Sequence, residues 1–203
     1  MSYIYKKIFS NNFPKLTYCH LSGFETIETI FQWTQTISLR ILKIGLIDFY
    51  VYKAILFACP NLYYLKLEMF QSYLKLSHIQ IHTKLKKLKI FSQIYDWHYN
   101  DQLIDIFLRC VSNLEELHIE RSISMSKIIE LIPNYDWLAS IIAIRLPLLR
   151  YFILCLDLEY NLEFFEFISI ETQYELKKSF FNAHQKRYQT QFIFKMKENK
   201  ILS

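Results

Sequence analysis

The sequence predicts an α/β solenoid of about six repeats, with parallel strands on the concave face and helices or irregular returns on the convex face. The first observation is a recurring spacing, L-x-x-L-x-L, whose three anchor positions are apolar in six segments. The second observation is its period, because the first anchors stand 23, 23, 23, 29 and 35 residues apart. The six segments are Leu16-Cys19-Leu21, Leu39-Leu42-Ile44, Leu62-Leu65-Leu67, Leu85-Leu88-Ile90, Leu114-Leu117-Ile119 and Leu149-Phe152-Leu154.

Each segment predicts one short strand. Its last two anchors are two residues apart, so both side chains point to the same face of a strand. One unit cannot bury this face alone, whereas stacked neighbours share a continuous core between the strands and the return segments. Apolar residues make up 52% of the 203 residues, which is enough to supply that core. We therefore expect an N-terminal cap at 1–12, a repeat domain at 13–158 and a C-terminal cap or tail at 159–203.

The returns between the strands are expected to be partly helical. Apolar residues follow helical spacing within residues 52–59 and again within 103–110, just before the third and fifth strands. The returns at 25–34 and 71–80 are too short or too β-branched to assign. Helical returns behind a row of strands complete the predicted α/β layers.

The 35-residue step is long enough for two short helices, at 126–132 and 137–144, separated by Pro133. The stretch 137–156 is the most apolar window of the chain. Arg145 and Arg150 lie in its centre, where charge is costly in a lipid bilayer. We therefore expect a buried helix followed by a strand, and no membrane partner.

Three stretches share a further phrasing. They are F-P-K-L-T-Y at 13–18, C-P-N-L-Y-Y-L-K-L at 59–67 and V-S-N-L-E-E-L-H-I at 111–119. Over residues 13–158 the chain thereby resembles the leucine-rich-repeat region of F-box/leucine-rich-repeat proteins. The resemblance implies a leucine-rich-repeat solenoid whose repeats bind a substrate protein. In that family a separate N-terminal F-box joins the repeats to a cullin-type ubiquitin ligase.

The chain departs from the family in two ways. Only twelve residues precede the first repeat, and no L-P-x-E motif opens them, so we expect the F-box itself to be missing from this chain. The Asn or Cys that usually follows each strand is also replaced, which predicts that packing takes over from a buried amide ladder in the N-terminal half. The equivalent positions hold Phe24, Ile47, Phe70, Gln93, Ser122 and Asp157.

The residue between the last two anchors of each segment points away from the core. These residues form a predicted row across the sheet: His20, Lys43, Lys66, Lys89, His118 and Ile153. The neighbouring row holds Tyr18, Ile41, Tyr64, Lys87, Glu116 and Tyr151. Adjacent lysines repel mildly unless solvent screens them or an anionic partner lies across them. The predicted partner-binding residues are His20, Lys43, Lys66, Lys89, His118, Tyr18, Tyr64 and Tyr151, and their predicted partner is an acidic or phosphorylated protein.

A second interpretation of the row is that these lysines are simply solvated side chains of a protein with net charge +5. The charge also permits nucleic-acid binding, but no motif of a nucleic-acid-binding fold accompanies it, so nucleic acid is disfavoured. The four cysteines are widely separated and occupy apolar positions, which predicts buried thiols in a reducing compartment. No secretion signal is expected at the N-terminus.

The sequence gives only weak indications of residue groups that could form an enzyme active site. His78 and His82 stand four apart but lack the glutamate of H-E-x-x-H, so both are interpreted as solvated histidines in a return loop. The acid–imidazole groups at 96–98 and 115–118 have no nucleophile placed beside them by a motif. We expect no catalytic residue, no metal site and no cofactor.

The sequence therefore predicts a non-enzymatic protein-binding domain, expected to be monomeric and cytoplasmic or nuclear. The resemblance suggests substrate recognition in a ubiquitin-ligase context. Two alternatives stay open: a free-standing or truncated repeat scaffold with no ligase link, and a basic nucleic-acid-binding protein.

Overall fold

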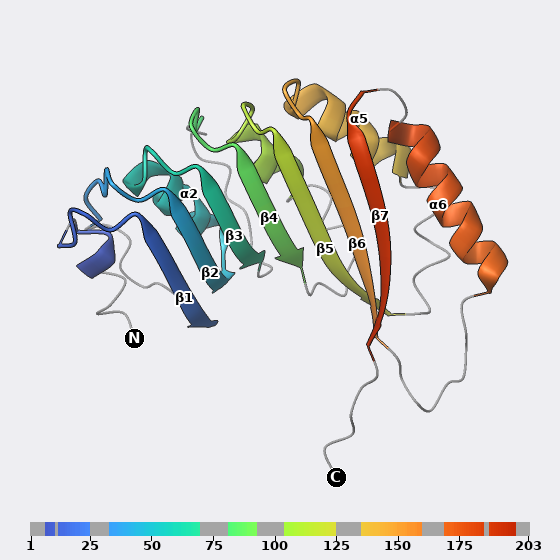
Figure 1. The fold of residues 1–203 in the computed structure, drawn as a ribbon, viewed down its shortest axis with the longest axis horizontal. Helices are drawn as coiled ribbons and strands as arrows, with labels where there is room; N and C mark the ends of the chain where they lie inside the picture. Colours follow the sequence, from blue (N-terminus) through green and yellow to red (C-terminus); the bar gives the residue numbers. More distant parts are fainter. Residues whose placement is uncertain are drawn as a thin grey trace, which may run out of the picture.

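A single seven-stranded parallel sheet forms the centre of the molecule, and its strands follow one another in chain order from β1 to β7 (Figure 1). The computed structural model describes residues 7–10, 12–24, 33–69, 81–92, 104–124, 135–159, 169–184 and 187–197. The strands are β1 (Tyr18–Phe24), β2 (Ile41–Ile47), β3 (Tyr64–Met69), β4 (Lys87–Ser92), β5 (Glu116–Ser124), β6 (Tyr151–Glu159) and β7 (Gln189–Lys197). The helices are α2 (Phe49–Ala58), α5 (Tyr135–Arg145) and α6 (Ile170–His184), with a further helical turn at 104–109.

The period of the sequence is visible in the backbone hydrogen bonds. The carbonyl oxygen just before each of the first five strands accepts bonds from two consecutive N–H groups of the next repeat. Thr17 O accepts from Arg40 N at 2.9 Å and Ile41 N at 3.0 Å, and the same pair of bonds recurs at later strands. The accepting residues are Thr17, Arg40, Tyr63, Lys86 and Glu115. This ladder keeps every strand in the same phase, so the register predicted from the six segments is confirmed.

The core lies between one face of the sheet and the returns, and α2 and α5 lie behind the sheet in Figure 1. The middle anchors pair across the strands, and Leu42, Leu65 and Phe152 among them are fully buried. On the helical side, Tyr52 stacks on Phe107 with ring centroids 4.2 Å apart, and its hydroxyl donates to the Phe107 carbonyl at 3.2 Å. Burying a phenol therefore leaves no polar group unsatisfied at this point.

Three predicted helices are confirmed, and one of them is the helical stretch at 104–109 within the predicted 103–110. Helix α2 covers the predicted 52–59 pattern and begins after Asp48, whose Oδ1 accepts the Val51 N–H at 2.8 Å as an N-cap. Helix α5 covers the predicted 137–144 helix. The predicted helix at 126–132 and most of the returns at 25–34 and 71–80 lie outside the described residues. No helix in the described ranges is both long and apolar enough to cross a membrane.

The strand count is a correction, since the described residues form seven strands where about six were predicted. Strand β7 continues the sheet in register, with Thr190 beside Phe152 and Phe192 beside Leu154. A polar threonine occupies the middle anchor of β7, so the L-x-x-L-x-L spacing is absent from its sequence. Helix α6 packs behind this last strand through Leu176, Phe180 and His184, which are all buried.

The interpretation of His82 as a solvated histidine is wrong, because its side chain is only 5% exposed. Its Nδ1 accepts the Leu85 N–H at 3.0 Å, so the ring must carry its proton on Nε2, which donates to the Cys59 carbonyl at 2.9 Å. Burial lowers the pKa of His82. The residue is a neutral link between two returns; its predicted counterpart His78 lies outside the described residues.

The positions that were predicted to follow the strands lie within strands where they are described, since Ile47 ends β2 and Ser122 and Asp157 lie inside β5 and β6. Ile47 is buried against the core, in place of a hydrogen-bonding amide. Ser122 and Asp157 are also buried, whereas Phe70, Gln93 and the side chain of Phe24 lie outside the description. All four cysteines are buried free thiols, as predicted.

Candidate functional site

The concave face is the face of the sheet that points away from the core. On it the strand register brings the predicted rows together as neighbours. His20 lies beside Lys43, Lys43 beside Lys66, and Lys66 beside Lys89, and the row ends with His118 and Ile153. Two residues earlier in each strand, Tyr18, Ile41, Tyr64, Lys87, Glu116 and Tyr151 form the second row. All eight predicted partner-binding residues therefore share one surface, while their binding role stays a prediction.

A hollow of about 400 Å³, here called the lysine depression, lies in this surface over β1 to β5. Its lining includes four residues of the predicted row, His20, Lys43, Lys66 and Lys89. The other lining residues are Leu21, Ser22, Ile44, Gly45, Leu67, Glu68, Phe91 and Glu120. The predicted site is thus a concave feature of the surface.

The hollow has a local cause in β2. Between Lys43 and Leu46 the register with β3 slips, so that Ile44 and Gly45 face a single residue of β3. This is a β-bulge, which bends a strand and increases its twist. Gly45 has no side chain, and Ser22 on β1 has a short one, so few side-chain atoms fill the concave face at this point. Larger side chains, Glu68 and Phe91, line the depression on the next two strands.

An internal carboxylate neutralises part of the lysine row, which the sequence did not reveal. Glu120 Oε2 lies 2.9 Å from Lys89 Nζ, and its Oε1 accepts from Lys195 Nζ at 2.5 Å. Burial by itself raises the pKa of the Glu120 carboxyl, but the bonds from Lys195 and Lys89 outweigh it and lower this pKa to about 2. Lys89 of the predicted row therefore already has a carboxylate partner within the chain. Lys195 comes from β7, the strand missing from the prediction.

The second row is neutralised in the same region. Lys87 Nζ lies 2.7 Å from Glu116 Oε1, and that hydrogen bond raises the pKa of Lys87. Just before these strands, Lys86 pairs with Glu115 at 3.0 Å and lowers the pKa of the Glu115 carboxyl. The signal for these pairs was present in the predicted rows, where Glu116 stands next to Lys87.

The other half of the row is different. In the described parts of the chain, none of the ion pairs involves Lys43 or Lys66. Lys43 Nζ instead lies 5.5 Å from the centroid of the Tyr18 ring, a cation–π contact with an exposed tyrosine. Lys66 is exposed between its two lysine neighbours. The positive charge of the depression is concentrated at these two residues.

His118 is a neutral member of the row. Burial lowers its pKa to about 4, and the charge of Lys89 acts in the same direction. Its Nε2 is buried and makes no hydrogen bond within the described ranges. Near neutral pH this ring adds no charge to the surface, in contrast to the adjacent lysines.

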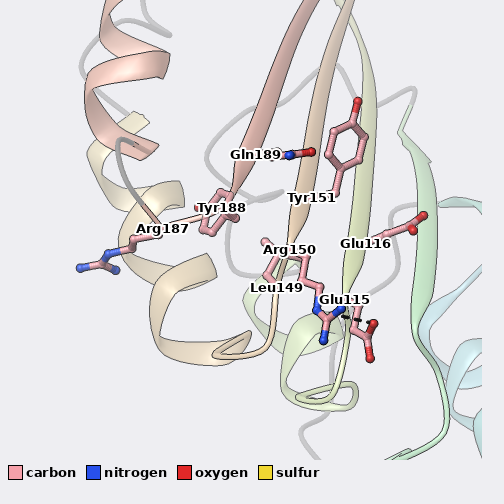
Figure 2. Close-up of a pocket in the computed structure, with 8 residues that line it drawn as sticks. All are labelled: Glu115, Glu116, Leu149, Arg150, Tyr151, Arg187, Tyr188 and Gln189. Atoms are coloured by element: carbon pink, nitrogen blue, oxygen red, sulfur yellow. Dashed lines mark ion pairs between the residues drawn. The ribbon is translucent and has the colours of Figure 1, made fainter.

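A second hollow of about 890 Å³, the edge pocket, lies where β5, β6 and β7 begin (Figure 2). Its lining residues are Glu115, Glu116, Leu149, Arg150, Tyr151, Arg187, Tyr188 and Gln189. Tyr151 donates to Gln191 Oε1 at 3.1 Å, and the Tyr188 hydroxyl bonds His184 Nδ1 at 2.6 Å. Arg187 points away from the other labelled side chains in Figure 2. The pocket brings Tyr151 from the predicted site close to the ion pair between Arg150 Nε and Glu115 Oε2, which are 3.9 Å apart.

Burial keeps two of the cysteines of the repeats in the thiol form. Burial raises the pKa of the Cys59 thiol to about 12 and that of Cys110 to about 11, which keeps both in the unreactive thiol form. Among the described residues, no three His, Cys, Asp or Glu side chains gather where they could hold a metal ion. The chemistry of the concave face is that of charge and hydrogen bonding.

Comparison with known proteins adds no relative. No protein-family model matches the chain, and no curated protein or solved structure matches it significantly.

Proposed function

We propose that this chain is a leucine-rich-repeat domain that binds a partner protein on the concave face of its sheet and has no catalytic activity. The observation that carries the proposal is the lysine depression, because four of the six residues that the repeat period places on one row also line one hollow. Repeat domains present such extended sheet surfaces to their partners. Tyrosines beside charged groups suit protein contacts, since they offer large area with few rotatable bonds; Tyr18 is exposed here, and Tyr64 and Tyr151 are half-buried.

The leucine-rich-repeat identity is supported by three properties taken together. The L-x-x-L-x-L segments recur at steps of 23, 23, 23, 29 and 35 residues. Each predicted segment coincides with one strand of a parallel sheet in chain order. Described helices, where present, stand between consecutive strands. A period of 20 to 29 residues with one strand per unit is typical of these repeats.

The binding face is tested by site-specific photocrosslinking. The photoreactive residue p-benzoyl-phenylalanine is placed at Tyr64 on the concave face or, as the matched control, at Phe57, an exposed aromatic residue of α2 on the helical side. We expect the Tyr64 position to crosslink a discrete protein in cells, and the Phe57 position to give none or a different one. The same crosslinked protein from both positions would contradict a concave binding face.

The ubiquitin-ligase context is a proposal that rests on the family resemblance. Its test is purification of the tagged chain followed by mass spectrometry of bound proteins. Cullin-ligase components among them would support substrate recognition within a ligase. A crosslinked partner without any ligase component would favour a free-standing repeat scaffold.

A further inference from the structure

We infer that the lysine depression binds an acidic side chain of the partner protein, a carboxylate or a phosphoryl group, and that Lys43 and Lys66 recognise it. The inference rests on the proposed function, since it names the chemistry of the partner at that face. It also assigns different roles to lysines that the sequence presents as equivalent.

The charge distribution selects Lys43 and Lys66. Lys89 is held by Glu120 at 2.9 Å, and Glu120 is in turn shared with Lys195. An incoming anion would have to compete with a carboxylate already in place there. Lys43 and Lys66 are direct neighbours on the sheet and take part in none of the ion pairs of the described residues. Two lysines that are neighbours on a sheet attract an anion, and their mutual repulsion falls when it binds.

The depression has room for a side chain of the partner, which a flat surface would not offer. The bulge at Gly45 and the short side chain of Ser22 leave space next to the two lysines. Phe91 lines the same hollow and offers an apolar contact for the methylene groups that carry an acidic tip. A partner side chain can therefore enter the hollow and reach Lys43 and Lys66 with its terminal oxygens.

Two carboxylates also line the hollow and must be counted. Glu120 is neutralised by the two lysines that contact it. The second carboxylate is that of Glu68. Three lysines and His20 line the same hollow, so the lysines outnumber the carboxylates. A basic side chain would meet an excess of positive charge here, whereas an acidic one would meet a complementary surface.

Purified full-length chain and fluorescein-labelled peptides test the inference by fluorescence anisotropy at low salt. The probes are hexaglutamate, a phosphoserine-containing glycine–serine peptide and, as controls, hexaglutamine and hexalysine. The double variant K43E/K66E is compared with K84E/K177E, which changes the net charge equally at two exposed lysines outside the depression. Circular dichroism confirms folding, and K43M/K66M replaces K43E/K66E if that variant does not fold.

We expect K43E/K66E to weaken hexaglutamate or phosphopeptide binding by about tenfold or more, and K84E/K177E to weaken it by less than about twofold. The tighter of the two anionic probes identifies carboxylate or phosphoryl recognition. Equal losses in both double variants would show attraction to net charge alone and would overturn the inference, as would failure of both anionic probes to bind the wild type.

Failure of this inference is distinguishable from failure of the proposed function. Crosslinking from Tyr64 that persists unchanged in K43E/K66E would leave the concave binding face standing while removing the anion site. If the wild type gave no crosslink that is specific to Tyr64, the proposed concave binding face itself would be contradicted.

Discussion

The concave face carries lysines on β2, β3 and β4, and their charges have different surroundings on the two sides of the boundary between β3 and β4. On β2 and β3, Lys43 and Lys66 take part in none of the ion pairs of the described residues. On β4, Lys87 and Lys89 each contact a carboxylate of β5, at 2.7 and 2.9 Å. The basic half is therefore suited to an external anion, whereas the neutralised half uses its charges to join strands.

The difference shows why lysines in one row of a parallel sheet cannot be treated as equivalent. The register that aligns Lys66 with Lys89 also aligns Lys87 with Glu116 and places Glu120 within reach of Lys89. A charge is available to a partner only if the neighbouring strand does not already supply its counterion. Three changes test this comparison, beginning where the two halves meet.

The largest expected effect is at His82, which links the returns on both sides of the boundary. Replacing it with leucine, H82L, keeps apolar bulk but leaves the buried Cys59 carbonyl and the buried Leu85 N–H without the partners they have now. The Cys59 carbonyl keeps its bond from the Leu62 N–H at 3.0 Å, so one unsatisfied buried N–H and one lost hydrogen bond should together lower the free energy of unfolding by about 3 kcal/mol. Urea unfolding followed by circular dichroism measures the loss.

The matched control is H20L at the exposed histidine that opens the lysine row. A surface change of this kind should alter the free energy of unfolding by less than about 0.5 kcal/mol. If H82L and H20L had equal effects, the two hydrogen bonds of His82 would not join the halves.

The second change removes the charge of Glu120, the carboxylate that contacts Lys89 and Lys195 in the neutralised half of the face. In E120Q, Lys89 and Lys195 lose their shared counterion but remain 24% and 46% exposed, so water can solvate them in part. The expected loss in the free energy of unfolding is about 2 kcal/mol, between the effects of buried and surface ion pairs. E175Q, which alters the exposed Glu175–Lys178 pair, serves as the control and should cost less than about 0.5 kcal/mol.

The pH dependence of this difference has a defined sign. The folded-state pKa of Glu120 is about 2, below the usual value of 4.5, so the unfolded chain binds its proton first. The stability contributed by the ionised carboxylate is complete above pH 4.5 and is lost as the pH falls towards 2. The gap between wild type and E120Q should therefore shrink by about half between pH 7 and pH 3. A gap that stays constant over this range would show that the glutamine acts through shape and not charge.

Much of this surface could be predicted from the sequence, because the period of the apolar anchors sets the register of the strands. The neighbours of Lys66 in the row follow directly from that period. Strand β7 was missed because Thr190 occupies an anchor position that is apolar in the other strands. Glu120 lies two residues beyond His118, outside the repeated spacing, so the period predicts neither its role on the concave face nor its contact with Lys195.

His82 was misinterpreted although its burial had a signal in the sequence. His82 stands three residues before its first anchor, where the two preceding repeats hold Thr36 and Cys59, and both of these are buried. The period therefore signals the burial of His82, but it does not reveal the hydrogen bond to a carbonyl 23 residues earlier in the chain. Periodicity therefore predicts the side chains that repeat, whereas the single polar contacts between repeats depend on the packed structure.

The smallest expected effect is a change in the free energy of unfolding that has opposite signs in the two halves. Lys66 has a lysine on each side, so K66M should raise the free energy of unfolding by a few tenths of a kcal/mol, within the range of about 0.2 to 1 kcal/mol for opposed like charges. K89M removes one contact of Glu120 and should lower the same free energy by about 1 kcal/mol. The gain in K66M should diminish in 0.5 M NaCl, where the Debye length falls to about 4 Å and the repulsion is screened. Urea unfolding of both variants at low and high salt measures these differences. Losses of equal size from both lysines would mean that the halves do not differ, and Lys66 would then be a structural residue with no charge available to a partner.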